Sequence, residues 1–143
     1  MRAFLFAAAL ACTLVVVAPA GTATGLLRAA PPQVHFGVRE VNTENLKGTT
    51  ITNTSDHDVL LLVTGYSMPD EFGFGLMPGS TCPALGAEIL AAGASCDAVM
   101  NFRPEEFWVG QERNAALLAT AYDPATGEVV DELIIEFTGR GRL

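Results

Sequence analysis

The residues best able to take part in chemistry are two histidines and the acids beside one of them. His57 lies between Asp56 and Asp58, and a histidine next to carboxylates could act as a base or bind a metal. Adjacent turn residues point in different directions, so these three side chains do not converge on one substrate without help from elsewhere. We therefore favour a solvated turn here. His35 neighbours Phe36 in a strand-like segment, where a surface or edge position is the default.

The methionines raise the alternative of an exported copper-binding protein, because such β-sandwich proteins use Met and His ligands. Met68 and Met77 lie in an irregular segment, whereas Met100 belongs to an alternating apolar pattern. A metal site would need His35, His57 and at least one methionine to converge, and the sequence has no Met-x-Met or His-x-Met cluster. Since core packing is the usual role of methionine, we expect no metal site and no cofactor.

Known catalytic motifs are missing from the chain. The sequence lacks Gly-x-Ser-x-Gly, His-Glu-x-x-His and a glycine-rich phosphate loop. Glu105 and Glu106 are adjacent and diverge, whereas a glycosidase needs two carboxylates at least about 5 Å apart across a cleft. We therefore predict that the protein is not an enzyme. The triplet Asn53-Thr54-Ser55 matches the N-glycosylation acceptor pattern, which also arises often by chance.

The amino terminus has the features of a secretory signal peptide. Arg2 is the only early charge, and an unbroken apolar run follows from Ala3 to Val17. The run ends at Ala18-Pro19-Ala20, where a peptidase could cut before Gly21. We predict a signal peptide over residues 1–20 and a secreted or extracytoplasmic location. The alternative is an uncleaved membrane anchor, because the apolar stretch approaches the roughly 20 residues that a membrane helix needs.

Removal of this leader changes both the charge and the cysteine count. It leaves seven basic and 16 acidic residues, a net charge of −9. An acidic surface argues against nucleic acid or anionic lipid as a partner. Cys12 is also removed, and the remaining Cys82 and Cys96 form an even pair, as expected of a disulfide in an exported chain. A structural zinc site is the weaker alternative, because it needs four ligands and closer cysteine spacings.

The mature chain has the rhythm of a β-sandwich. Residues 21–32 are small, polar or proline-containing and predict a linker. From Gln33 onward, short apolar runs are broken by Gly, Pro, Asn or Asp, and no segment keeps the helical period. We expect one all-β domain over residues 33–143, an immunoglobulin-like sandwich of about seven strands. The expected strands include residues 34–41, 48–54, 59–64, 96–102, 115–122 and 128–137, the last two joined as a hairpin.

Two irregular segments carry aromatic residues that could meet a partner. Phe107-Trp108-Val109 follows Pro104 in an expected loop, and it forms either an apolar plug over the end of the sandwich or a contact patch. We favour the plug. The stretch from Tyr66 to Met77 contains the second group, Phe72-Gly73-Phe74. Glycine next to these aromatic residues lets the loop adapt to a partner. The candidate partner contacts are therefore Phe107, Trp108, Phe72 and Phe74.

Several short motifs follow one another in a recognisable order from Gln33 to Arg142. They are Phe36-Gly37 with Val41, Thr52-Asn53-Thr54-Ser55, Cys82, Leu90 with Gly93, Ser95-Cys96, Phe102-Arg103-Pro104, Gly110 and Gly139-Arg140-Gly141. In this order and spacing they resemble the choice-of-anchor D, or ASH/Hydin-like, family of immunoglobulin-type domains. The departures are Ser55 and Asn42, where that family usually has glycine, and Val38-Arg39, whose apolar residue normally comes second.

The resemblance implies a PapD-like β-sandwich used for cohesion, scaffolding or partner binding, with no catalytic residues to carry over. We therefore predict a non-catalytic, disulfide-containing module that acts through an unidentified protein partner in the cell envelope or outside the cell. It would not insert into the membrane once the signal peptide is cleaved. Two alternatives stay open, an exported copper-binding protein and a membrane-anchored structural component of the envelope.

Overall fold

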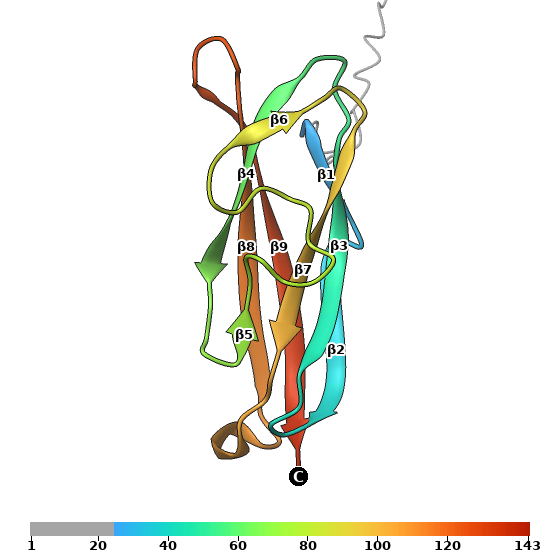
Figure 1. Cartoon of the computed structure of the whole chain (residues 1–143). Coiled ribbons are helices and arrows are strands. Elements are labelled where there is room, and N and C mark those ends of the chain that lie inside the picture. Colours follow the sequence, from blue (N-terminus) through green and yellow to red (C-terminus); the bar gives the residue numbers. More distant parts are fainter. Residues whose placement is uncertain (1–24) are drawn as a thin grey trace, which may run out of the picture.

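The computed structural model describes residues 25–143, so the predicted signal peptide lies outside the described residues. The described chain forms two β-sheets that pack face to face as an elongated sandwich (Figure 1). A single turn of 3-10 helix, η1 (Glu106–Trp108), interrupts the strands. The prediction of an all-β domain is confirmed. Within residues 25–143, no helix is long and apolar enough to span a membrane.

The two sheets have four and five strands. The four-stranded sheet has the order β1 (Leu27–Ala30), β3 (Asn45–Asn53), β7 (Ser95–Phe102) and β5 (Phe72–Gly73). The five-stranded sheet has the order β2 (Gln33–Glu40), β9 (Val129–Arg142), β8 (Glu112–Tyr122), β4 (Val59–Ser67) and β6 (Glu88–Leu90). All paired strands are antiparallel except β2 and β9, which are parallel. The predicted hairpin is β8 and β9.

Strand β1 corrects the prediction of a linker over residues 21–32 for its own residues, whereas residues 21–24 lie outside the described residues. Leu27 and Ala29 alternate with exposed neighbours and belong to the buried core. β1 pairs with β3, with Leu27 opposite Asn53. Pro31-Pro32 suggested a linker because proline breaks regular structure. In the fold these prolines separate β1 from β2, so the chain passes from one sheet to the other at that point, and the sandwich begins before Gln33.

The core lies between the sheets and is built from alternating strand residues. On β7, Ala98, Met100 and Phe102 all point inward and are fully buried, as their alternation predicted. Phe102 packs against Phe36 on β2, with ring centroids 5.3 Å apart. Phe137 on β9 completes this aromatic cluster, at 6.4 Å from Phe36. Aromatic side chains from both sheets therefore hold the sandwich together.

Two of the sequence motifs contact each other across the sandwich. A Cβ atom on Gly139 would overlap the ring of Phe102, and one on Gly141 would lie 2.9 Å from Cβ of Pro104. Both positions therefore need glycine, because any side chain would push the two segments apart. The Phe-x-Pro and Gly-x-Gly motifs are thus two halves of one close contact. It lies towards the end of the sandwich that carries the carboxyl terminus, called the lower end here (Figure 1).

The predicted disulfide between Cys82 and Cys96 is confirmed. Both cysteines are buried. Backbone N–H groups of Thr81 and Cys82 donate to the carbonyl oxygen of Asp97, at 2.8 and 3.0 Å. The bond therefore fastens the irregular segment between β5 and β6 against β7. The two cysteines are 14 positions apart. Closing a loop of that length restricts the unfolded chain, which contributes roughly 3 kcal/mol to stability.

Candidate functional site

The connection between β7 and β8 forms a tight turn around η1 at the lower end (Figure 1). The Trp108 N–H donates to the carbonyl oxygen of Glu105 at 3.1 Å, and the Gln111 N–H donates to that of Trp108 at 3.0 Å. The Gly110 N–H donates to the carbonyl oxygen of Gly141 at 3.0 Å. The turn is therefore closed by its own backbone and tied to β9.

Three side chains stack on one another at this turn. Phe107 meets Trp108 edge to face, with ring centroids 4.7 Å apart. The guanidinium carbon of Arg113, at the start of β8, lies 4.0 Å from the centre of the Trp108 ring, a cation–π arrangement. Phe107 remains 79% exposed, whereas Trp108 is half-buried. We call Phe107, Trp108 and Arg113 the aromatic knuckle.

A buried carboxylate holds Arg113 in this position. Arg113 Nε donates to Glu71 Oε1 at 2.6 Å, and Nη2 donates to Oε2 at 3.4 Å. The Glu71 side chain is 1% exposed and that of Arg113 is 23% exposed. The Glu71 carbonyl oxygen also accepts a hydrogen bond of 2.7 Å from the Arg103 N–H. Because an unpaired buried carboxylate is costly, this ion pair fixes Arg113, and Arg113 in turn supports Trp108.

Asn42 supports the same turn from the neighbouring connection between β2 and β3. Its backbone has φ of 60°, in the left-handed region. Its N–H donates to the carbonyl oxygen of Pro104 at 2.9 Å, and its Nδ2 lies 3.4 Å from Glu106 Oε1. Asparagine adopts this conformation more readily than other residues with a side chain. Asn42 therefore keeps the backbone conformation that a glycine would allow, and its side chain adds a hydrogen bond to η1.

The four predicted contact residues separate into different environments. Phe72 is buried and stacks on Phe102, with ring centroids 4.7 Å apart, so proposing it as a contact was wrong. Phe74 is partly buried and packs against the core. Phe107 and Trp108 lie at the surface, and η1 has no buried residue. The favoured interpretation of this segment as a plug is therefore wrong for Phe107, which is largely exposed, whereas Trp108 and Val109 are half-buried.

The histidines have separate partners. His57 Nδ1 lies 3.1 Å from Asp56 Oδ1 in an exposed turn, and this hydrogen bond lowers the pKa of the Asp56 carboxyl. His35 Nδ1 lies 2.7 Å from Thr138 Oγ1, on β9. In the part of the chain that the structure describes, no group of three or more His, Cys, Asp and Glu residues could hold a metal ion. Met68 packs against the core instead.

The glycosylation triplet is a structural site. Asn53 is 0% exposed, and its Nδ2 donates to the carbonyl oxygens of His57, Leu90 and Ala91 at 2.8, 3.1 and 3.3 Å. Its Oδ1 accepts hydrogen bonds from both the N–H and the hydroxyl of Ser55, at 3.1 and 2.7 Å. Because the nitrogen that would carry a glycan is buried, the folded domain offers no acceptor here.

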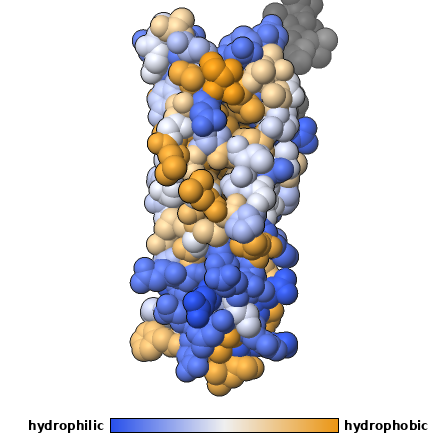
Figure 2. Space-filling view, in the orientation of Figure 1, coloured by the Kyte–Doolittle hydropathy of each residue, from blue (hydrophilic) through white to orange (hydrophobic). Residues whose placement is uncertain are grey.

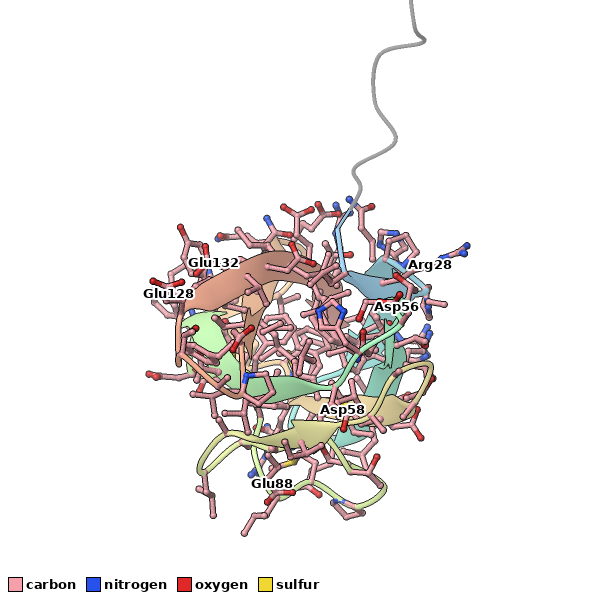
Figure 3. All side chains as sticks on the ribbon, turned by 90° about the horizontal axis from the view of Figure 1, so that it is seen from above. Arg28, Asp56, Asp58, Glu88, Glu128 and Glu132 are labelled. Atoms are coloured by element: carbon pink, nitrogen blue, oxygen red, sulfur yellow. A yellow bond between two sulfur atoms is a disulfide. The ribbon has the colours of Figure 1, made fainter. Side chains whose placement is uncertain are left out.

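The two ends of the sandwich differ in surface chemistry. Figure 3, seen from above, labels five carboxylates and one arginine spread over the upper end: Asp56, Asp58, Glu88, Glu128, Glu132 and Arg28. Figure 2 shows hydrophobic residues spread over the upper part of one face, a hydrophilic band below them, and apolar residues again at the lowest end. Phe107 and Leu143 are the exposed large apolar residues of η1 and the carboxyl terminus. What distinguishes the lower end is therefore an exposed aromatic side chain, Phe107, which has the acidic residues Asp70, Glu105 and Glu106 beside it.

Glu71 and Arg113 were missed by reasoning from sequence. They are 42 positions apart, and neither belongs to a motif. One signal was available, because Arg113 shares the alternation of Ala115 and Leu117, the inward-facing residues of β8. A charged residue at an inward position needs a buried partner. The identity of that partner could come only from the fold.

No protein-family model and no curated protein sequence matches this chain. Solved structures do resemble it. An ASH/PapD-like domain of human CEP192 has a TM-score of 0.62 at 10% identity, covering 92% of this chain and 96% of that one. WR4, a member of the C. elegans MSP family, has a TM-score of 0.55 at 14% identity, covering 80% and 98%. The E. coli chaperone DraB has a TM-score of 0.57 at 15% identity, covering 82% of this chain and 55% of its own.

The fold is ASH/PapD-like. This immunoglobulin-like architecture agrees with the resemblance found in the sequence motifs, at the level of the fold. The chain spans nearly the whole of the human and nematode domains but only about half of the chaperone. At such low identities the likeness establishes the arrangement of strands and leaves function to the site itself.

Proposed function

We propose that this protein is a non-catalytic, exported immunoglobulin-like module that binds a protein partner through the aromatic knuckle. The observation that carries the proposal is the exposure of Phe107 on a rigid support. Its neighbours Trp108 and Arg113 are fixed by the buried Glu71. Aromatic and arginine residues dominate the binding energy of protein interfaces, and a side chain that is already ordered loses less entropy on binding.

The fold and the disulfide support the other parts of this proposal. The similar structures include a chaperone, an MSP family member and an ASH/PapD-like domain. The contact between Phe102 and Gly139 gives a physical reason for two motifs of the choice-of-anchor D family, to which we assign the chain. Export is supported by the Cys82–Cys96 disulfide, because such bonds persist in oxidising compartments.

Affinity capture tests the knuckle directly. Residues 21–143 would be immobilised and exposed to envelope and extracellular fractions of the host, with wild type compared with Phe107→Ser and with Leu85→Ser. Leu85 is as exposed as Phe107 but lies in the segment between β5 and β6, so it controls for the loss of any surface apolar group. We expect wild type and Leu85→Ser to retain the same protein and Phe107→Ser to retain at least about tenfold less. Equal retention by all three forms would discard the knuckle as the binding site.

A further inference from the structure

Strand β8 buries apolar residues on its inward face and mixes small, apolar and polar residues on its outward face. Ala115, Leu117, Ala119 and Ala121 are its buried inward residues. On the outward face Ala116 and Thr120 are only 9% and 7% exposed, and Leu118 is half-buried. Antiparallel sheets with one solvated face usually alternate apolar and polar residues. Ala116 and Leu118 therefore form a small apolar area among polar residues on the outer face of the five-stranded sheet.

A groove crosses the outer face where β8 has small side chains. Its floor includes Asn114 and Ala116. Tyr66 on β4, 63% exposed, stands on one side, and Ile134 on β9, 49% exposed, stands on the other. In the strand register Ala116 lies opposite Ser67 of β4 and Glu136 of β9, so two small residues are adjacent at this point of the sheet. The hollow has a volume of about 520 Å³.

The charged residues that line this groove are both acidic. Glu112 and Glu136 lie there, together with uncharged residues. Glu136 accepts a hydrogen bond of 3.1 Å from Gln33 Nε2. Among the described residues neither acid takes part in an ion pair, and Arg140, the cross-strand neighbour of Glu112, makes none with it. The groove therefore combines an apolar centre with two carboxylates that, among the described residues, make no ion pair.

Charge also selects among the possible occupants. The part of the chain after the predicted leader has 16 acidic and seven basic residues, so a second copy would bring like charges together across this face. A basic segment gains attraction instead, both over long range and beside the two glutamates. Charge complementarity thus favours a different protein over self-association.

We propose that this groove binds an extended segment of a second protein that carries a large aliphatic side chain close to a lysine or arginine. The aliphatic group fills the space between Tyr66 and Ile134 above Ala116. The cation meets Glu112 or Glu136. The site lies on the outer sheet face and not at η1. The proposal for the groove and the proposal for the aromatic knuckle can therefore be tested independently.

A titration followed by NMR tests this proposal with defined probes. The ¹⁵N-labelled domain, residues 21–143, receives the blocked hexapeptide Gly-Lys-Leu-Ile-Lys-Gly and, separately, Gly-Glu-Leu-Ile-Glu-Gly, each up to millimolar concentration. We expect the lysine peptide to shift the amide signals of Tyr66, Ala116 and Ile134 most, and to bind about fivefold or more tightly than the glutamate peptide, as two surface charge pairs would provide.

Charge reversal makes the test specific. In the Glu112→Lys/Glu136→Lys double variant the preference should reverse, so that the glutamate peptide binds more tightly. The matched control is Glu44→Lys/Glu88→Lys, which makes the same charge change at two exposed glutamates outside the groove and should keep the original preference. The dispersion of the amide spectrum reports whether each variant is folded.

Several results would overturn the proposal. They are shifts that fall elsewhere on the domain, equal binding of both peptides, no shift at millimolar peptide, or the same loss in the control variant. Amide shifts in the groove that depend on protein concentration without peptide would show self-association, which also contradicts a basic partner.

Discussion

Two buried polar side chains at opposite ends of the sandwich both fasten loops, but the contacts that follow from them reach different parts of the molecule. At the upper end, Asn53 makes hydrogen bonds to three carbonyl oxygens and to Ser55. At the lower end, Glu71 binds Arg113, which lies against Trp108. Every partner of Asn53 belongs to the adjoining strands and turns. The contacts of Glu71 continue outward until they reach an exposed phenylalanine.

The difference shows how a structural polar residue can be told from one that supports a contact surface. Burial does not distinguish them, since the side chains of Asn53 and Glu71 are both almost fully buried. The contacts that their partners make in turn do distinguish the two residues. Asn53 stabilises the fold and nothing beyond it, although its triplet looks like a modification site. Glu71 holds in place a surface aromatic residue that contributes little to the core.

Asn53→Ala should have the largest effect on stability. It removes the amide that donates to the carbonyl oxygens of Leu90 and Ala91, the first of these bonds being buried, and it empties a fully buried side-chain position. We expect the free energy of unfolding to fall by about 3 kcal/mol. Urea unfolding followed by circular dichroism measures this loss. Ser55→Gly is the matched control, because it keeps the Asn53 amide and should cost less than about 1 kcal/mol. Equal costs for the two variants would mean that the amide network contributes little.

Glu71→Gln should have a smaller effect on stability and a specific effect on the knuckle. Arg113 keeps some contact with solvent, so we expect a loss of about 2 kcal/mol. Trp108 is the only tryptophan of the chain, and its fluorescence therefore reports the knuckle alone. Acrylamide should quench it more strongly in Glu71→Gln than in wild type, since Arg113 no longer holds the ring. Quenching that stays unchanged in the folded variant would separate Glu71 from the knuckle.

The smallest predicted effect concerns acid at the upper end. Asp123 Oδ1 accepts hydrogen bonds from the N–H groups of Thr126 and Ala125, at 2.9 and 2.7 Å, and these lower the pKa of the Asp123 carboxyl. A pKa that is lower in the folded state contributes stability above the unfolded value of about 3.9, and this stability is lost as the pH falls through the folded pKa.

Asp123→Asn should therefore show a slightly weaker loss of stability than wild type as the pH falls below about 4. Chemical unfolding over a pH series measures the two slopes. Glu44→Gln, which removes another exposed carboxylate of the same charge, serves as the control. If Asp123→Asn and wild type lose stability in parallel, the hydrogen bonds of this turn carry no linkage to pH.

Local pattern predicted most strands but not the contacts between distant segments. The alternation in β7 and β9, the hairpin and the disulfide follow from residues close together in sequence. β1 was hidden by Pro31-Pro32, because pairing with β3 outweighs a local signal for a linker. Phe72 and Phe107 look alike in sequence, yet β5 pairs with β7 and draws Phe72 into the core. That outcome depends on tertiary pairing, which no local pattern contains.

The central claim is that the exposed phenylalanine of the knuckle touches a protein partner. The most direct test replaces Phe107 with the photoreactive benzoylphenylalanine in the full-length protein, and, separately, Leu85 with the same group. Irradiation of intact host cells should yield one discrete crosslinked species from position 107 and none from position 85. Crosslinks from neither position, or the same products from both, would contradict the claim.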